Sequence, residues 1–148
     1  MVGVVNDVKL PETLAFRLGT VGAVVADRFA ERIAAHDLKP KHAGLLTALS
    51  AGEVASQQDL AARLGVAPSL VVALADHLEG LGAIERVRDP RDRRRQVLTL
   101  TGHGRELLQA CGEAARSLDE EITAGLSAAQ RKALQAALGV LAAEAGRR

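Results

Sequence analysis

The sequence is poor in aromatic side chains. Among its 148 residues these are Phe16 and Phe29 alone, with no tryptophan or tyrosine. Modules that bind single-stranded nucleic acid, or that read RNA sequence, usually stack bases on aromatic side chains. The scarcity of aromatics therefore argues against such modules, and it favours duplex DNA if the partner is a nucleic acid.

Cysteine is scarce as well, and long apolar runs and a leader pattern are missing. The single cysteine, Cys111, excludes an internal disulfide framework and fits a reducing compartment. No apolar run approaches the ~18 residues that a membrane-spanning helix needs. The first residues show no basic start followed by an apolar block, so we expect no secretory signal. These features predict a cytoplasmic protein without a membrane partner.

The sequence also offers no obvious catalytic or metal-binding group. The four histidines form no pair at the spacing that puts two ligands on one helix face. No nucleophile, base and acid can be assembled into a reactive cleft. Cys111 lies on an apolar stripe with no basic neighbour to lower its thiol pKa, so we interpret it as a buried structural residue. We expect no enzymatic activity, no metal and no cofactor.

What the chain does have is helical periodicity typical of one globular domain. Apolar residues recur at helical spacing over residues 8–37, with Pro11 suited to the first turn. Pro40 opens a shorter helix that Gly52 stops. Ser56 starts a capping box, so the next helix is predicted from Ser56 to Leu64.

A turn at Gly65 leads to a further helix whose first turn holds Pro68. We call it the recognition helix, because a helix in this position can enter a DNA groove. Its predicted inward face is Val71, Leu74, Ala75 and Leu78.

Residues 84–88 and 96–100 alternate and are rich in branched side chains, which predicts two antiparallel strands. We call the hairpin over residues 84–100 the wing. The predicted fold is mainly α with this small two-stranded β wing. A winged helix-turn-helix unit at 38–101 is flanked, in one domain, by long dimerisation helices at 8–37 and 102–146.

Positive charge is concentrated in the wing. Six arginines lie between Arg86 and Arg95 against Asp89 and Asp92, a local net charge of +4, whereas the whole chain carries +1. Guanidinium groups suit phosphates and narrow minor grooves because they are planar and always charged. The predicted DNA-binding residues are Ser56, Gln57, Pro68, Ser69, Leu70, Ala73, His77, Arg88, Arg91, Arg93, Arg94 and Arg95.

The helices outside the winged unit carry long apolar stripes with little left inside that unit to cover them. Exposed stripes of this length are unusual in a soluble monomer. We therefore expect a two-fold homodimer, whose recognition helices would lie about one DNA turn apart on a near-palindromic site. The predicted interface residues are Leu14, Leu18, Val21, Leu134, Leu138 and Leu141.

The sequence resembles the MarR (multiple antibiotic resistance regulator) family of winged-helix transcription regulators over nearly its whole length. The specific motif is Asp92-Arg93-Arg94, followed by Leu98-Thr99-Leu100-Thr101 and Gly104-Arg105-Glu106-Leu107-Leu108. Leu60-Ala61 with Leu64-Gly65-Val66, and Leu78-Glu79 with Gly82, also match the family pattern.

The resemblance implies a homodimer that binds palindromic promoter DNA, with the recognition helix in the major groove and wing arginines in the flanking minor groove. It also implies that Asp92 pairs with Arg94 and shapes the wing loop. Many members of the family release DNA when a small aromatic or phenolic effector binds. We therefore expect a sequence-specific, duplex-DNA-binding repressor.

The recognition helix departs from the family pattern. It carries Ala67, Pro68, Leu70 and Ala73 where the family commonly has polar residues and an arginine, which leaves Ser69 as the hydrogen-bonding side chain of the first turns. With so few polar side chains, the recognition helix could select its DNA sequence in another way. Leu70 or Ala73 would contact thymine methyl groups, and the wing would read the shape of the groove. The alternative is that the protein discriminates poorly between DNA sequences. A winged-helix module for protein–protein contact remains the rival from a different class.

Overall fold

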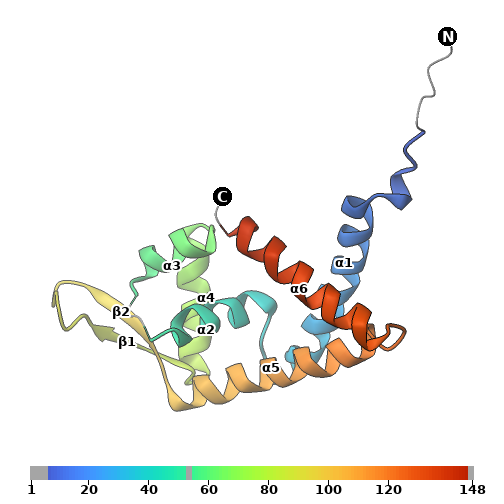
Figure 1. The fold of residues 1–148 in the computed structure, drawn as a ribbon. Coiled ribbons are helices and arrows are strands. Elements are labelled where there is room, and N and C mark those ends of the chain that lie inside the picture. Colours follow the sequence, from blue (N-terminus) through green and yellow to red (C-terminus); the bar gives the residue numbers. More distant parts are fainter. Residues whose placement is uncertain (1–6, 53–54, 147–148) are drawn as a thin grey trace, which may run out of the picture. The chain divides into compact units, whose positions relative to one another are not determined.

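Six α-helices and one two-stranded antiparallel sheet make up residues 7–52 and 55–146, the part of the chain that the computed structural model describes (Figure 1). The chain divides into two compact units, one up to Ala115 and one from Arg116 onward. The predicted mainly helical fold with a β wing is confirmed. In order, the elements are α1 (Leu14–Ile33), α2 (Pro40–Ser50), α3 (Gln57–Leu64), α4 (Pro68–Gly80), β1 (Ile84–Arg88), β2 (Gln96–Leu100), α5 (Gly102–Ile122) and α6 (Ala128–Ala145).

The start of α1 differs from the prediction. Pro11 lies in a short 3-10 turn, Leu10–Glu12, and not in the first turn of the long helix. The helix begins at Leu14, because the Thr13 hydroxyl accepts a hydrogen bond from the Phe16 amide at 3.2 Å and caps it. A hydroxyl cap satisfies an otherwise unpaired amide, which the proline ring cannot do.

The predicted capping box of α3 is confirmed. The Ser56 hydroxyl accepts from the Asp59 amide, and the Asp59 carboxylate accepts from the Ser56 amide, each at 3.1 Å. The helix ends at Gly65, whose left-handed backbone (φ 64°) allows the tight turn into α4. The recognition helix is therefore α4, and it begins at Pro68 as expected.

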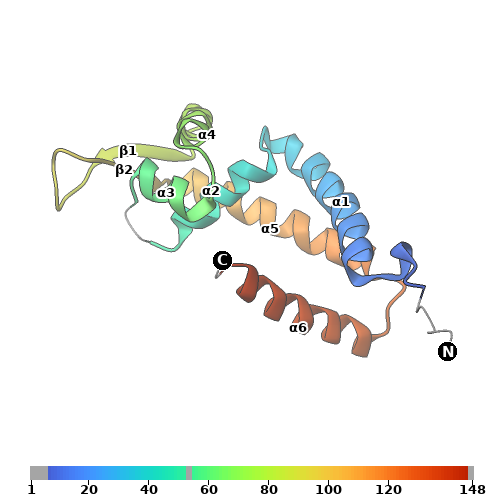
Figure 2. The same cartoon turned by 90° about the horizontal axis from the view of Figure 1, so that it is seen from above.

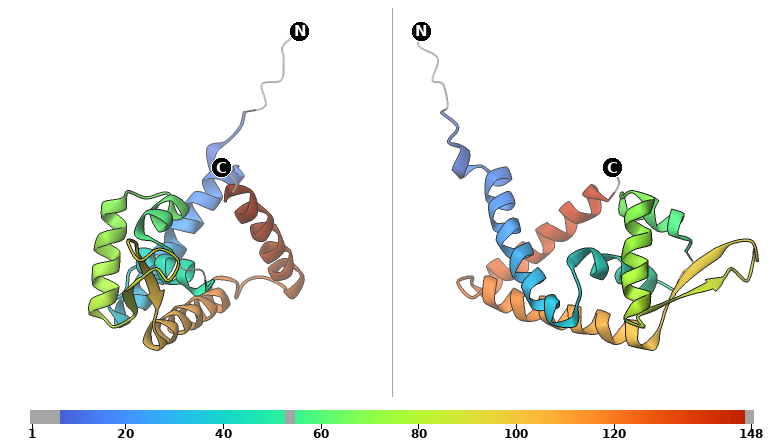
Figure 3. Two further views of the ribbon diagram at one scale, coloured as in Figure 1. Left: turned by 90° about the vertical axis from the view of Figure 1, so that its left-hand side faces the viewer. Right: turned by 180° about the vertical axis from the view of Figure 1, so that it is seen from behind.

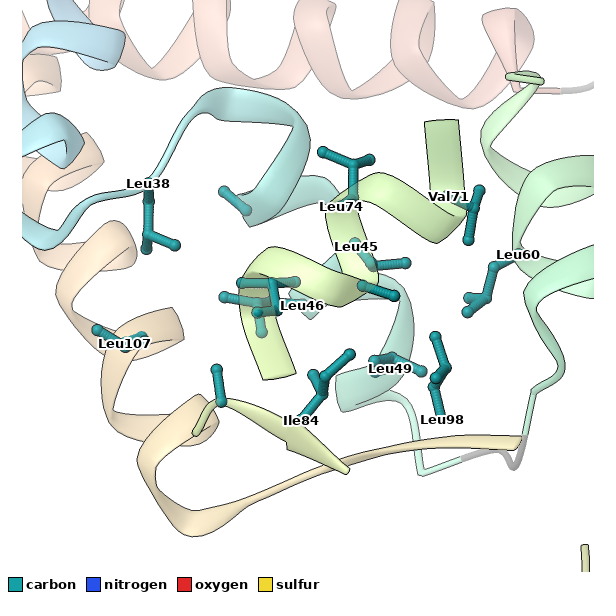
Figure 4. Packing of buried hydrophobic residues seen from close by; sticks show 14 of the residues in the cluster. Leu38, Leu45, Leu46, Leu49, Leu60, Val71, Leu74, Ile84, Leu98 and Leu107 are labelled. Atoms are coloured by element: carbon teal, nitrogen blue, oxygen red, sulfur yellow. The ribbon is translucent and has the colours of Figure 1, made fainter. Parts of the chain in front are cut away.

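The core of the first unit lies between α2, α3, α4 and the sheet. The inward face predicted for α4 is confirmed, since its four residues are all buried. Figure 4 shows these apolar side chains pointing toward one another from helices and strands that are distant in sequence. The labelled members are Leu38, Leu45, Leu46, Leu49, Leu60, Val71, Leu74, Ile84, Leu98 and Leu107.

The wing is anchored at its base. Ile84 pairs with Leu100 and Arg88 with Gln96, which gives the register of the two strands. The Leu98 amide also donates to the Ala55 carbonyl at 3.0 Å, so the segment before α3 adds one bridge to the hairpin. Figure 2 shows the hairpin reaching out beyond α3 and α4.

The start of α5 packs tightly under the wing. A Cβ atom on Gly104 would lie 2.1 Å from the Ala83 carbonyl oxygen, so glycine is the residue that fits at this close approach. The Thr101 hydroxyl donates to the Gly82 carbonyl at 2.6 Å and accepts from the Gly104 amide at 3.0 Å. This contact fixes the direction in which α5 leaves the wing.

Apolar side chains remain uncovered on two helices. On α1, Leu14 is 77% exposed and Val21 60% exposed; on α6, Leu138 is 44% exposed. Among the described residues no single helix is long and apolar enough to cross a membrane. Helices α3 and α4 meet that test only when taken together, across a break bent by 114°.

Candidate nucleic-acid interface

The recognition helix α4 presents one face to the core and the opposite face to solvent. The solvent face follows helical spacing through Ser69, Val72, Ala73 and Asp76, all of them exposed. Val72 is 40% exposed, a large fraction for a valine in a folded domain. The right-hand view of Figure 3 shows α4 beside the base of the wing. Both elements belong to the first unit, so they form one continuous surface.

Two of the predicted contact residues do not lie on this solvent face. Leu70 is half-buried and packs against the core cluster. His77 turns toward the end of α1, where its Nε2 lies 2.6 Å from the Asp37 carbonyl oxygen. Its ring stacks on that of His42, with centroids 4.3 Å apart. Ser69 and Ala73 lie on the solvent face, as helical spacing indicates. The core contacts of Leu70 and the Asp37 partner of His77 are distant in sequence and could not be predicted from it.

His42 has a structural role at the start of α2. It is 6% exposed, and its Nδ1 accepts a hydrogen bond from the Lys39 amide at 2.9 Å. Burial lowers the pKa of His42, and the nearby His77 and Lys39 lower it further. A neutral ring is what this position requires, because a protonated Nδ1 could not accept from the amide.

The wing loop is shaped by aspartate side chains that bind backbone amides. The Asp89 carboxylate accepts from the Arg91 amide at 2.9 Å, and the Asp92 carboxylate accepts from the Arg94 amide at 3.1 Å. The Arg95 amide then donates to the Asp92 carbonyl at 3.0 Å. Asp92 and Arg94, which the resemblance pairs, thus meet through the main chain, and the Arg94 guanidinium remains in solvent.

One of the six wing arginines, Arg86, is paired with acidic side chains of α4. Arg86, whose side chain is 18% exposed, donates to Asp76 at 2.6 Å, to Glu79 at 2.9 Å and to the Gln57 carbonyl group at 3.3 Å. Sequence reasoning counted it with the other wing arginines. Asp76 and Glu79, two acids three residues apart on α4, were the available signal for this cluster.

A second arginine is also partly neutralised. Arg95 forms an ion pair with Asp59, which ties the wing to the first turn of α3. Hydrogen bonds from Ser56, and secondarily the charge of Arg95, lower the pKa of Asp59, so this carboxylate stays ionised.

Four wing arginines remain available. They are exposed, and they make no ion pair with any residue in the described part of the chain. They are Arg88, Arg91, Arg93 and Arg94.

Two polar residues predicted to contact DNA from α3 are already engaged. The Ser56 hydroxyl caps the helix and is 8% exposed, and the Gln57 side chain accepts from Arg86. Pro68 is exposed at the first turn of α4 and has no amide hydrogen to donate. The interface that remains is the solvent face of α4 and the free arginines of the wing.

The buried cysteine fits the interpretation made from sequence. Cys111 is 4% exposed on α5, and burial raises the pKa of its thiol. Within residues 7–52 and 55–146, no group of three or more His, Cys, Asp or Glu side chains is arranged to hold a metal ion.

The sequence pattern of the MarR family matches residues 36–95. YdgJ of Bacillus subtilis (strain 168), described as an uncharacterised HTH-type transcriptional regulator, is 31% identical over 90 residues. That match covers 61% of this chain and 55% of YdgJ, so the chain spans about half the length of the curated relatives it matches.

The fold is similar to that of a transcriptional repressor, CouR, in its structure bound to a 23-mer DNA duplex. The identity is 31%, the TM-score is 0.76, and the match covers 90% of this chain and 94% of that chain. The structure of CouR from Rhodococcus jostii RHA1 bound to p-coumaroyl-CoA matches at 25% identity with a TM-score of 0.71, over 90% of this chain and 94% of that chain. The chain belongs to the MarR family of winged helix-turn-helix transcription regulators.

Proposed function

We propose that this protein is a homodimeric repressor that binds a near-palindromic duplex operator. The observation that carries the proposal is the pairing of two surfaces in one unit. The solvent face of α4 is narrow enough to enter a major groove, and beside it lies a hairpin with four arginines that no described residue neutralises. Phosphate-rich DNA supplies the negative charge that this surface lacks.

The dimer is supported by apolar side chains left in solvent on α1 and α6. Burying such a side chain contributes about 1.5–3 kcal/mol relative to leaving it in water, so a second copy that covers several of them offsets the cost of association. A two-fold arrangement also places two α4 helices about one DNA turn apart. The exposed members are Leu14, Leu18, Val21, Leu134, Leu138 and Leu141.

A small aromatic or phenolic effector is the proposed release signal. Support comes from CouR, which is similar in fold and has been solved with p-coumaroyl-CoA. In this chain a hollow beside α4 is lined by Ala34, Asp37, Leu38, Lys39, His42 and His77. A ligand there would press on the imidazole stack of His42 and His77, which joins α2 to α4, and would thereby change the position of the recognition helix.

A rival function is a winged-helix module that binds an acidic protein partner. The observation in its favour is that Val72 and Ala73 give the exposed face of α4 an apolar surface. At low ionic strength the proposed repressor would bind duplex DNA, whereas the rival module would bind an acidic protein and no specific duplex.

A gel-shift assay with the promoter region upstream of the protein's own gene separates them. The proposed function predicts a shift that Arg94→Ala weakens on every operator tested. Arg116→Ala is the control, because it removes an exposed arginine from α5, outside the wing. Adding candidate phenols to the same gels tests the release signal. No shift of any duplex at very low salt would refute the proposed function.

A further inference from the structure

The solvent face of α4 has almost no means of hydrogen bonding to a base. Ser69 has the one hydroxyl group among the exposed residues of its first two turns, and Val72 and Ala73 follow at helical spacing. The helix carries no arginine, lysine, asparagine or glutamine. Guanine is usually read by arginine or lysine, and adenine by asparagine or glutamine. This face therefore lacks the usual partners of both purines.

The acid on the same face is occupied. Asp76 would be the partner for the exocyclic amine of cytosine, but its carboxylate accepts from Arg86 at 2.6 Å. Glu79, one turn further along, accepts from the same guanidinium at 2.9 Å. The single guanidinium offsets one of the two negative charges that would otherwise meet the phosphates. The exposed face of the first two turns of α4 is left mainly apolar.

Thymine is the base that such a surface can distinguish. In the major groove it presents a 5-methyl group that the other three bases lack, and apolar side chains make contact with it. We propose that Val72 and Ala73 read thymine methyl groups and that this contact is the main sequence discrimination of α4. The proposal rests on the proposed DNA-binding function and names which part of the duplex the helix recognises.

The structure corrects the residue assignment made from sequence for this contact. Leu70 and Ala73 were the candidates there, but Leu70 packs against the core. Val72 takes its place, because it lies on the solvent face with 40% of its surface exposed. Ser69 is one turn before it and provides the remaining polar contact.

The positive charge beside this face of α4 favours duplex DNA as its binding partner. The face is continuous with the wing, where Arg88 and Arg93 are exposed without an acidic partner among the described residues. An apolar helix face flanked by free guanidinium groups is complementary to a groove floor of methyl groups between two phosphate chains. A purely apolar protein partner would leave those charges without a counterpart.

The test starts from a pool of randomised 24-base-pair duplexes, because the operator is not needed in advance. Duplexes retained by the full-length protein are sequenced, and the preferred duplex is remade with deoxyuridine replacing thymine at one position at a time. Deoxyuridine keeps the base pair and removes only the methyl group. We expect half-sites with thymine at fixed positions, and a loss of about fourfold in affinity for each contacted methyl removed.

Two variants identify the side chain responsible. Val72→Ala should shrink the deoxyuridine penalty, because the methyl then has little to contact. Val87→Ala is the matched control, since Val87 is 37% exposed but lies on β1 and not on α4. Arg93→Ala should weaken binding to all duplexes and leave the penalty unchanged.

The possible results differ clearly. A preferred duplex that tolerates deoxyuridine at every position, or half-sites read at guanine, would overturn the thymine proposal and leave DNA binding intact. Failure to retain any duplex would overturn the proposed function and this inference with it. The wild-type deoxyuridine series keeps the inference testable even if Val72→Ala does not fold.

Discussion

Removing the Arg86 guanidinium should destabilise the fold, whereas removing that of Arg88 two residues later should not. Arg86 is 18% exposed and donates to Asp76 and Glu79 at 2.6 and 2.9 Å. Arg88 lies at the end of the same strand, exposed and without an ion pair among the described residues. The two substitutions Arg86→Met and Arg88→Met therefore form a matched pair.

The magnitude follows from the partners. Hydrogen bonds to charged groups each contribute about 1.5–3 kcal/mol when buried. Asp76 is 64% exposed and Glu79 45% exposed, so water screens both, and exposed pairs contribute at most about 1 kcal/mol. Arg86→Met should thus lower the free energy of unfolding by about 1–2 kcal/mol, whereas Arg88→Met should change it by less than about 0.5 kcal/mol.

The assay is urea unfolding followed by circular dichroism, at one fixed protein concentration because dimer stability depends on concentration. DNA affinity measured alongside should fall for both variants. On the proposed function, Arg88→Met would lose a phosphate contact, and Arg86→Met would free two carboxylates beside the proposed DNA-binding surface. Equal unfolding midpoints for the two variants would refute the reasoning that separates a structural arginine from a binding one.

Three further outcomes are expected. Gly104→Ala should destabilise the protein by about 1–3 kcal/mol, because the added Cβ would strike the Ala83 carbonyl. Gly112→Ala, which has open space around it, should stabilise α5 by up to about 1 kcal/mol. Thermal unfolding of both variants checks these two expectations. Because the pKa of His42 is lowered in the folded chain, the unfolded chain binds more protons, and stability should fall as the pH drops below about 6.5; the slope should flatten in His42→Gln. Arg93→Ala should reduce the steepness with which DNA affinity falls with salt, seen as a smaller slope in a binding titration across salt concentrations.

The local structure was predictable wherever neighbouring residues determine it. Ser56 and Asp59 are three residues apart, so their capping box could be read directly from the sequence. The bounds of both wing strands were also predicted, because alternation and branched side chains end abruptly at the charged loop. The start of α1 was not, since Thr13 and Pro11 both suit a helix start and the hydroxyl cap prevailed.

The orientation of the interface residues could not be predicted, because it depends on distant partners. Arg95 meets Asp59 across 36 positions of sequence, and His77 meets Asp37 across 40. Arg86 was counted in the positive charge of the wing, although its guanidinium is paired with Asp76 and Glu79. The Arg86 and Arg95 ion pairs reduce the free charge of the wing, and the Arg86 pair also occupies Asp76 on the solvent face of α4.

The most direct test of the account is sedimentation velocity of the purified protein with a fluorescent duplex of its own promoter, at low and at moderate salt. We predict that the free protein sediments as a dimer, that two chains join one duplex at low salt, and that the complex dissociates as salt rises. A protein that stays monomeric, or that leaves the duplex unbound at very low ionic strength, would contradict the account.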